Sequence, residues 1–297
     1  MDGRTFRDLV RPFTLLAPAV GSLSGAVAAA AATDVALPVG TVALGVAAAL
    51  SATGASNAWN QAFDADIDRV NKPERPIPAG RVTVGAALRL GHVLAALALA
   101  LGLLATPAFG ACIAVGVLCT WIYSAPPLRT KASLVGALLT IAVPRGLLVP
   151  VAGWSLVVAP WTRTDPWALG VVIFLFVLGA AATKDFADVA GDRAHGCRTL
   201  PVVLGARRAA VLIAPFLALP FLLLVAAAGA GWLGAPLPAW AVLAGLLTAL
   251  GAVAAWTLVR EPEGLASRGT NHPAWKAMYL LMLGFHVGAA LVYVLAG

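Results

Sequence analysis

Charged residues are scarce in this chain of 297 residues. Asp, Glu, Lys and Arg together make up 11% of it, against roughly 25% in an average soluble domain. Apolar residues make up 61%, and the mean hydropathy is +0.91. This composition excludes an ordinary soluble domain and indicates a membrane protein that crosses the bilayer several times.

Cysteine and histidine are also rare. The three cysteines, Cys112, Cys119 and Cys197, have no spacing typical of a metal site or a disulfide framework, and the four histidines are isolated from one another. The sequence therefore excludes zinc-type ligand motifs and a disulfide scaffold.

Long apolar runs are the main feature that is present. Since a bilayer core of about 30 Å needs roughly 20 apolar residues per helix, we predict nine membrane helices and an all-α fold. They are expected at 13–33, 38–62, 83–104, 107–124, 133–157, 166–189, 207–229, 236–258 and 275–296.

Basic residues mark one side of the predicted bundle. With nine spans, the N-terminal tail and the loops on the same side of the membrane together hold 18 of the 20 Lys and Arg residues, while Arg163 lies on the opposite side and Arg145 lies within the fifth span. Lys and Arg accumulate in cytoplasmic loops, so we expect a cytoplasmic N-terminus and a multi-pass protein of the cell membrane. The net charge of +7 is explained by this bias and by anionic lipids. We expect no nucleic acid and no obligate protein partner.

Acidic residues are concentrated in two short runs. Six of the thirteen lie there, as Asp64, Asp66 and Asp68 and then as Asp185, Asp188 and Asp192. If each run continues a helix, Asn60, Asp64 and Asp68 share one face, as do the three acids of the second run, and Asp66 points elsewhere. Like charges so placed repel each other, so a cation is expected between them.

The two runs belong to an internal repeat. Asp64 and Asp68 match Asp188 and Asp192 at an offset of 124, and an R-x-x-P sequence follows each pair. We predict a single domain with pseudo-repeats over about 13–124 and 133–258 and a final helix at 275–296. Four spans separate the copies, so both runs should face the same side and converge on one cavity.

The residue types favour magnesium and a diphosphate. Carboxylate oxygens suit Mg²⁺, which completes its shell with water and substrate phosphates. Cationic side chains that could bind the phosphates flank the runs: Arg69, Lys72, Arg75, Arg129, Lys131 and Lys184.

Three motifs resemble the UbiA superfamily of intramembrane prenyltransferases. N-x-x-x-D-x-x-x-D at 60–68 with R-P-I-P-A-G-R at 75–81 resembles its first motif, and D-x-x-x-D at 188–192 with G-x-x-T-L-P at 196–201 resembles the second. Y-S-A-P-P-L-R-T-K at 123–131 is similar to the loop after the fourth helix, which supplies Tyr123 and basic residues.

The resemblance implies a bundle of nine helices around a central cavity at the cytoplasmic side. Mg²⁺ would be held by Asp64, Asp68, Asp188 and Asp192, with Asn60 as a further ligand to metal or phosphate. The activity implied is transfer of an isoprenoid chain from a prenyl diphosphate to a lipophilic acceptor, a transfer of alkyl groups other than methyl (EC 2.5.1 type).

The acceptor depends on the branch of the superfamily. Gln61, where many members carry Asp, and the P-R-G sequence at 144–146 resemble the homogentisate-prenyltransferase branch, so we expect an aromatic acceptor and a role in quinone biosynthesis. The alternatives are a lipid ether synthase, a tetrapyrrole-esterifying synthase or a terpene cyclase, and more remotely a transporter.

Three further residues are candidates for the site. Asp185 is the candidate base, and Tyr123 is a cation stabiliser or a packing residue. Arg145 lies mid-span, where a lone charge is expensive and usually functional, so it is expected to contact the acceptor or a phosphate.

Overall fold

A computed structural model describes residues 1–268 and 272–296. Within these ranges all regular structure is helical, and nine helical segments are long and apolar enough to cross a membrane. Every predicted boundary agrees within two residues, because the apolar runs end at charged or Pro- and Gly-containing sequences. The segments are Pro12–Thr33, Val39–Phe63, Val84–Ala105, Pro107–Ser124, Leu134–Ser155, Asp165–Ala187, Ala206–Gly229, Leu237–Arg260 and Pro273–Ala296.

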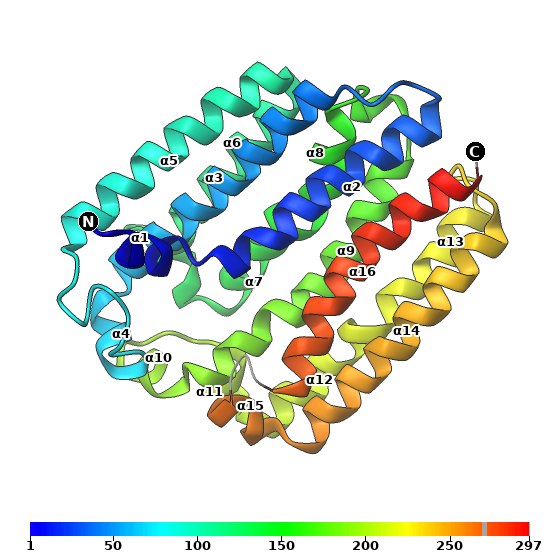
Figure 1. Ribbon diagram of the computed structural model, residues 1–297. Coiled ribbons are helices and arrows are strands. Elements are labelled where there is room, and N and C mark those ends of the chain that lie inside the picture. Colours follow the sequence, from blue (N-terminus) through cyan, green and yellow to red (C-terminus); the bar gives the residue numbers. More distant parts are fainter. Residues whose placement is uncertain (269–271, 297) are drawn as a thin grey trace.

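The helices of the nine membrane segments in the described residues lie side by side in one bundle (Figure 1). They are α2 (Leu16–Thr33), α3 (Val39–Phe63), α5 (Val84–Ala105), α6 (Pro107–Ser124), α7 (Leu134–Ala142), α8 (Leu148–Ser155), α9 (Asp165–Ala182), α12 (Ala206–Ala218), α13 (Leu223–Gly229), α14 (Leu237–Arg260) and α16 (Pro273–Ala296).

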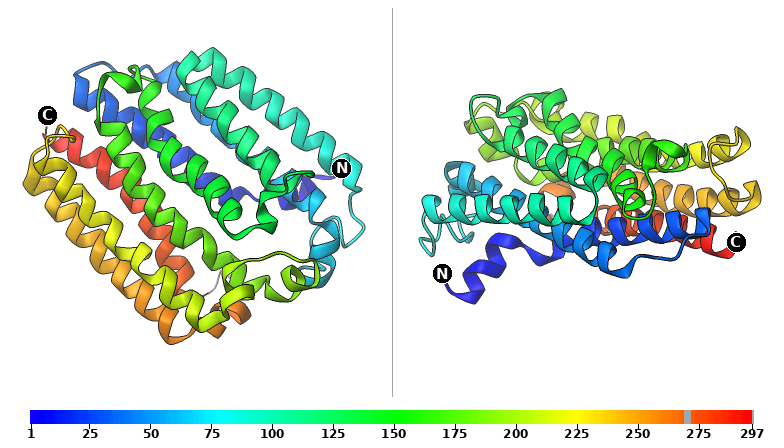
Figure 2. Two further views of the ribbon diagram at one scale, coloured as in Figure 1. Left: turned by 180° about the vertical axis from the view of Figure 1, so that it is seen from behind. Right: turned by 90° about the horizontal axis from the view of Figure 1, so that it is seen from above.

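Short helices gather at one end of the bundle (Figure 1). They are α4 (Ala65–Asn71), α10 (Val189–Ala194), α11 (Leu200–Leu204) and α15 (Pro262–Arg268). The N-terminal helix α1 (Gly3–Val10) and the C-terminal end of α16 lie at opposite ends of the bundle (Figure 2).

Small residues let the central helices approach closely. A Cβ atom added to Gly25 of α2 would lie 2.9 Å from the Cα of Gly153 in α8. Without a hydrophobic driving force between helices in lipid, association depends on such close van der Waals packing.

The fifth span is interrupted where Arg145 lies. A π-helical turn, Val143–Leu147, separates α7 from α8 and contains Pro144, which cannot donate a backbone hydrogen bond. Gly146 in the same turn packs against α9, where an added Cβ would meet the Cα of Phe174 at 2.5 Å. Such turns are frequent at functional sites.

Helix α1 is attached to α3 through its last carbonyl groups. The side-chain amide of Asn57 donates to the Val10 carbonyl at 2.7 Å, and that of Gln61 donates to the Leu9 carbonyl at 2.9 Å. Gln61 is 1% exposed. The glutamine that departs from the common pattern of the first motif therefore docks the N-terminal helix.

A polar cluster closes the end of the bundle opposite the short helices. Asp165, which is 2% exposed, accepts hydrogen bonds from Tyr293 Oη at 2.6 Å, the Gly234 amide at 2.8 Å and Arg163 Nε at 2.9 Å. These bonds connect α9 and α16 with the loop before α9, which holds Arg163, and the loop before α14, which holds Gly234.

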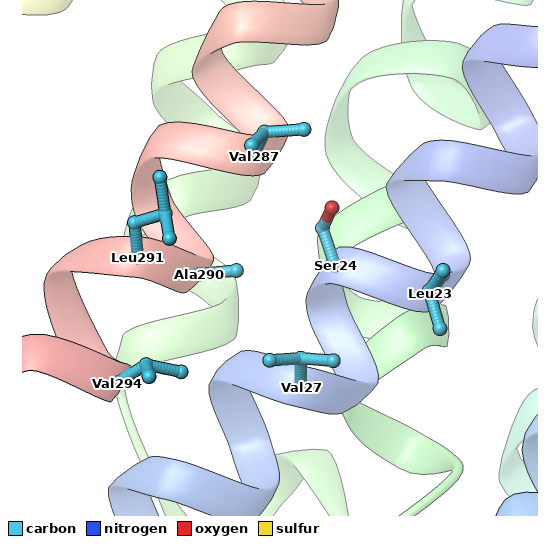
Figure 3. A pocket seen from close by; sticks show the side chains of 7 residues that line it. All are labelled: Leu23, Ser24, Val27, Val287, Ala290, Leu291 and Val294. Carbon is cyan, nitrogen blue, oxygen red and sulfur yellow. The ribbon is translucent and has the colours of Figure 1, made fainter.

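A shallow, open apolar groove of about 210 Å³ lies between α2 and α16. Figure 3 shows side chains of both helices along it, and the Ser24 hydroxyl is the one polar side-chain group among the lining residues. The groove is lined by Leu23, Ser24, Val27, Val287, Ala290, Leu291 and Val294.

Candidate active site

Both acidic motifs change backbone conformation at an aspartate. Helix α3 ends at Phe63, Asp64 takes φ −101° and ψ 12°, and α4 follows. Asp188 takes φ −108° and ψ 5° between the 3₁₀ turn Thr183–Ala187 and α10. The predicted face holds from Asn60 to Asp64, whose side chains form a hydrogen bond of 2.8 Å, but each acidic motif has a helix break at an aspartate, Asp64 or Asp188.

The helix break at Asp64 gives the two aspartates of the first motif, Asp64 and Asp68, different partners. Four-residue spacing is compatible with an unbroken helix, but the break directs Asp64 toward the loop after α6 and Asp68 toward Arg75. Asp66 points elsewhere, as predicted, and pairs with Arg69. Both of these side chains are well exposed, at 75% and 64%, so the structure does not bring Arg69 to the other candidate residues.

The two motifs are in direct contact, as the repeat predicts. Asn71, at the end of α4, donates to the Asp188 carbonyl at 3.1 Å and accepts from the Gly191 amide at 2.9 Å. Lys72 forms an ion pair with Asp188. Gly191 leaves no room for a side chain, since an added Cβ would lie 2.4 Å from Asn71.

Asn71 is a site residue that the sequence reasoning missed. It lies outside the N-x-x-x-D-x-x-x-D pattern, and its only signal was its place three residues after Asp68.

Asp64 is surrounded by donors. Asn60 Nδ2 donates to Oδ2 at 2.8 Å, Lys131 Nζ forms an ion pair with Oδ1, and Arg129 Nη2 lies 4.0 Å from Oδ1. Arg129 adopts φ 34°, uncommon for a residue with a side chain. The Ala132 carbonyl, next to Lys131, accepts from the Arg198 amide at 3.1 Å, which connects this loop to the second motif.

Asp68 and Asp192 are both buried, at 3% and 9% exposed. Arg75 Nη1 donates to both oxygens of Asp68, at 2.8 and 2.7 Å. Burial raises the pKa of Asp68 in spite of this pairing. Burial, together with the neighbouring Asp188, also raises the pKa of Asp192, which accepts a long 3.4 Å hydrogen bond from Thr199.

A second polar group lies at the ends of the fourth and sixth spans. Lys184 Nζ donates to the Tyr123 hydroxyl at 2.7 Å and lies 4.8 Å from the centre of the Tyr123 ring. Arg145 is within electrostatic range of both. In the described part of the chain, Asp185 makes no ion pair, unlike Asp64, Asp68 and Asp188.

Arg11 lies between this group and the acidic motifs. Its backbone adopts φ 53°. Burial, followed by the nearby Arg75 and Arg145, lowers its pKa to about 10, so it stays protonated at neutral pH.

The oxygen-rich donor set fits a hard divalent cation. Four carboxylates and the Asn60 amide meet at one end of the bundle, which suits Mg²⁺ better than softer metals. Over residues 1–268 and 272–296, however, no three His, Cys, Asp or Glu side chains converge on one point. Lys131, Lys72 and Arg75 instead neutralise three of the carboxylates.

Nine membrane helices with two touching acidic motifs at one end define an intramembrane enzyme architecture. The chain belongs to the UbiA prenyltransferase family, whose model matches residues 20–270.

Curated relatives match most of the chain. Digeranylgeranylglyceryl phosphate synthase from Ignicoccus hospitalis is 36% identical over 293 residues, covering 96% of this chain and 91% of the relative. The Bacteriochlorophyll synthase 33 kDa chain from Cereibacter sphaeroides is 32% identical over 267 residues, covering 88% and 85%.

Solved structures share the fold. A UbiA homolog from Archaeoglobus fulgidus bound to GPP and Mg²⁺ superposes with a TM-score of 0.77 at 20% identity, covering 98% of this chain and 99% of that one. A structure concerned with digeranylgeranylglyceryl phosphate synthase gives a TM-score of 0.71 at 20% identity, covering 98% of each chain. The predicted all-α fold is confirmed, with nine candidate membrane helices in residues 1–268 and 272–296.

Proposed function

We propose that this protein is a Mg²⁺-dependent prenyltransferase that moves an isoprenoid chain from a prenyl diphosphate to a lipophilic acceptor in the membrane. The observation that carries the proposal is the contact between the two acidic motifs, bridged by Asn71 and Lys72 and surrounded by cationic side chains. Family membership and the homolog bound to GPP and Mg²⁺ support the same donor and metal.

The roles of the residues follow from their placement. Asp64, Asp68, Asp188 and Asp192 would hold the metal, and Asn60 would add an amide oxygen. When bound, Mg²⁺ would neutralise charge that develops on the leaving diphosphate. Cationic side chains around the acids would bind the phosphate oxygens: Lys72, Arg75, Arg129 and Lys131.

In the transfer, allylic C1 of the donor exchanges its bond to the diphosphate oxygen for a bond to the acceptor. The bond from allylic C1 to the diphosphate oxygen breaks and leaves an allylic cation, to which an acceptor oxygen or carbon then bonds. The acceptor's proton passes to Asp185, whose carboxylate has no ion-pair partner in the described residues. Tyr123 and Lys184 would position the reacting groups beside it.

The acceptor we favour is a hydroxyl-bearing glyceryl phosphate lipid. Relatives named for digeranylgeranylglyceryl phosphate support this alternative over the aromatic acceptor expected from Gln61 and the P-R-G sequence. The positively charged side chains of Arg145 and Arg11, near the acidic motifs, could bind the phosphate of such an acceptor. A tetrapyrrole acceptor is a second candidate, favoured by the relative named for bacteriochlorophyll.

The membrane side is part of the proposal. The loops at the acidic end carry most of the Lys and Arg residues, which favours a cytoplasmic site. The acids also lie at one end of the spans rather than at their middle, which disfavours a transporter.

The test is an assay of the purified full-length protein with Mg²⁺. Prenyl diphosphates of several lengths would be combined with a mono-prenylated glyceryl phosphate, a bacteriochlorophyllide and homogentisate, and products read by mass spectrometry. We expect the glyceryl phosphate product, and its loss in Asp64→Ala and Asp188→Ala. Full transfer by either variant would contradict the proposed site.

A further inference from the structure

Two lysine side chains form ion pairs with carboxylates that the proposed function assigns to the metal. Lys131 Nζ donates to Asp64 Oδ1, and Lys72 Nζ donates to Asp188 Oδ1. The Lys131 pair is enclosed, with side-chain exposures of 7% and 11%, and the Lys72 pair is more open, at 27% and 23%. The chain has four lysines, Lys72, Lys131, Lys184 and Lys276, and two of them pair with these carboxylates.

Both oxygens of Asp64 are engaged, because Asn60 Nδ2 takes Oδ2 while Lys131 takes Oδ1. Each carboxylate oxygen has two lone pairs, but a divalent cation bound there would repel the nearby ammonium group. Metal binding at Asp64 therefore favours the departure of Lys131, and metal binding at Asp188 Oδ1 favours the departure of Lys72.

The third pair has a different character. Arg75 holds both oxygens of Asp68 through one nitrogen, at 2.8 and 2.7 Å, and both side chains are well enclosed. Guanidinium is a rigid group suited to fixed geometry, whereas lysine is a point charge on a flexible stem with three donors that can be redirected. Lysine is thus the residue type suited to a change of partner.

We infer that Lys131 and Lys72 are exchange residues: each neutralises a metal-binding carboxylate in the metal-free enzyme and transfers its ammonium group to the diphosphate when metal and diphosphate load together. The inference rests on the proposed function. It goes further, since it makes the two loading events interdependent.

The interdependence follows from charge. Mg²⁺ alone would leave a displaced ammonium group without an anion in a poorly solvated place, so it binds weakly. Diphosphate alone also binds weakly, because both lysines remain paired with Asp64 and Asp188. Bound together, the metal frees the lysines and the diphosphate receives them, which gives positive coupling between the two ligands.

The experiment is calorimetric titration of MgCl₂ into the purified full-length wild type, Lys72→Met, Lys131→Met and Lys276→Met. Lys276 is exposed on α16 and serves as the control for loss of one positive charge. We expect Lys72→Met and Lys131→Met to bind Mg²⁺ alone about tenfold more tightly than the wild type, within the usual range of coupling between sites. Lys276→Met should match the wild type.

In saturating Mg²⁺, inorganic diphosphate should bind the same two variants more weakly than it binds the wild type. If removing the buried Lys131 charge prevents folding, the more open Lys72→Met variant carries the test.

The outcomes separate the two claims. If Lys72→Met binds Mg²⁺ no more tightly than the wild type yet loses diphosphate affinity, Lys72 is only a phosphate ligand; the exchange is overturned and the proposed function stands. If the wild type binds neither Mg²⁺ nor inorganic diphosphate in the presence of Mg²⁺, the proposed function itself fails.

Discussion

The Asp165 cluster provides a test that separates stability from activity. Tyr293→Phe removes one hydrogen bond to a buried carboxylate, at 2.6 Å, while its ring keeps its contacts with Trp154 and Trp240. A hydrogen bond to a charged group contributes about 1.5–3 kcal/mol. Asp165→Asn disturbs all three bonds, and we expect it to cost about 2–3 kcal/mol, a value lowered because Arg163 is 36% exposed.

The assay is thermal unfolding of the purified protein followed by tryptophan fluorescence. Since 1 kcal/mol shifts Tm by about 2–4 °C in chains somewhat shorter than this one, Tyr293→Phe should lower Tm by roughly 3–8 °C. The control, Tyr279→Phe, loses a bond to the neutral Phe13 carbonyl at 2.6 Å and should lose less. Prenyl transfer per folded molecule should not change in Tyr293→Phe, because Asp165 precedes the second motif by a full span of α9. The reasoning is refuted if Tyr293→Phe shifts Tm by less than about 1 °C, or if it reduces transfer while Tm holds.

The other predictions concern the site. Asp64→Ala should reduce kcat/KM by about 100-fold or more through loss of metal, whereas the neighbouring exposed Asp66→Ala should retain full activity; equal losses would dismiss the metal assignment. Arg145→Leu should raise the KM for a phosphate-bearing acceptor about tenfold, as expected for loss of one charge-assisted bond, and an unchanged KM would exclude that contact. Because the pKa values of Asp68 and Asp192 are raised, activity and Mg²⁺ affinity should decline at a higher pH than an ordinary aspartate allows. A raised pKa means that the folded state binds those protons more tightly, so the Tm of the metal-free protein should not fall over the same pH range; a parallel fall would identify unfolding as the cause.

Hydropathy was sufficient to place the membrane helices. The cost of charge in hydrocarbon is large and local, so each apolar run ended where its helix ends. The placement of Asp66 away from the site also followed from spacing alone, because a helical residue two positions from Asp64 and Asp68 faces elsewhere.

Pairing across the fold could not be derived in the same way. Spacing suggested that Asp64 and Asp68 share a helical face, but tertiary contacts decide their partners, with Lys131 lying 67 residues from Asp64. The role of Asn71 was hidden for the same reason, since its bonds reach 117 and 120 residues along the chain. Arg69 and Arg75 have the same charge and lie close in sequence, yet only Arg75 faces an enclosed carboxylate.

The ion pairs also imply an order of events during synthesis. The partner of Asp68 lies seven residues later, so this bond can form as soon as the second loop leaves the ribosome. Asp64 must wait until a further 67 residues are made, and Lys72 waits for an aspartate 116 residues downstream. The Lys72–Asp188 ion pair can therefore form only after the sixth span has been synthesised.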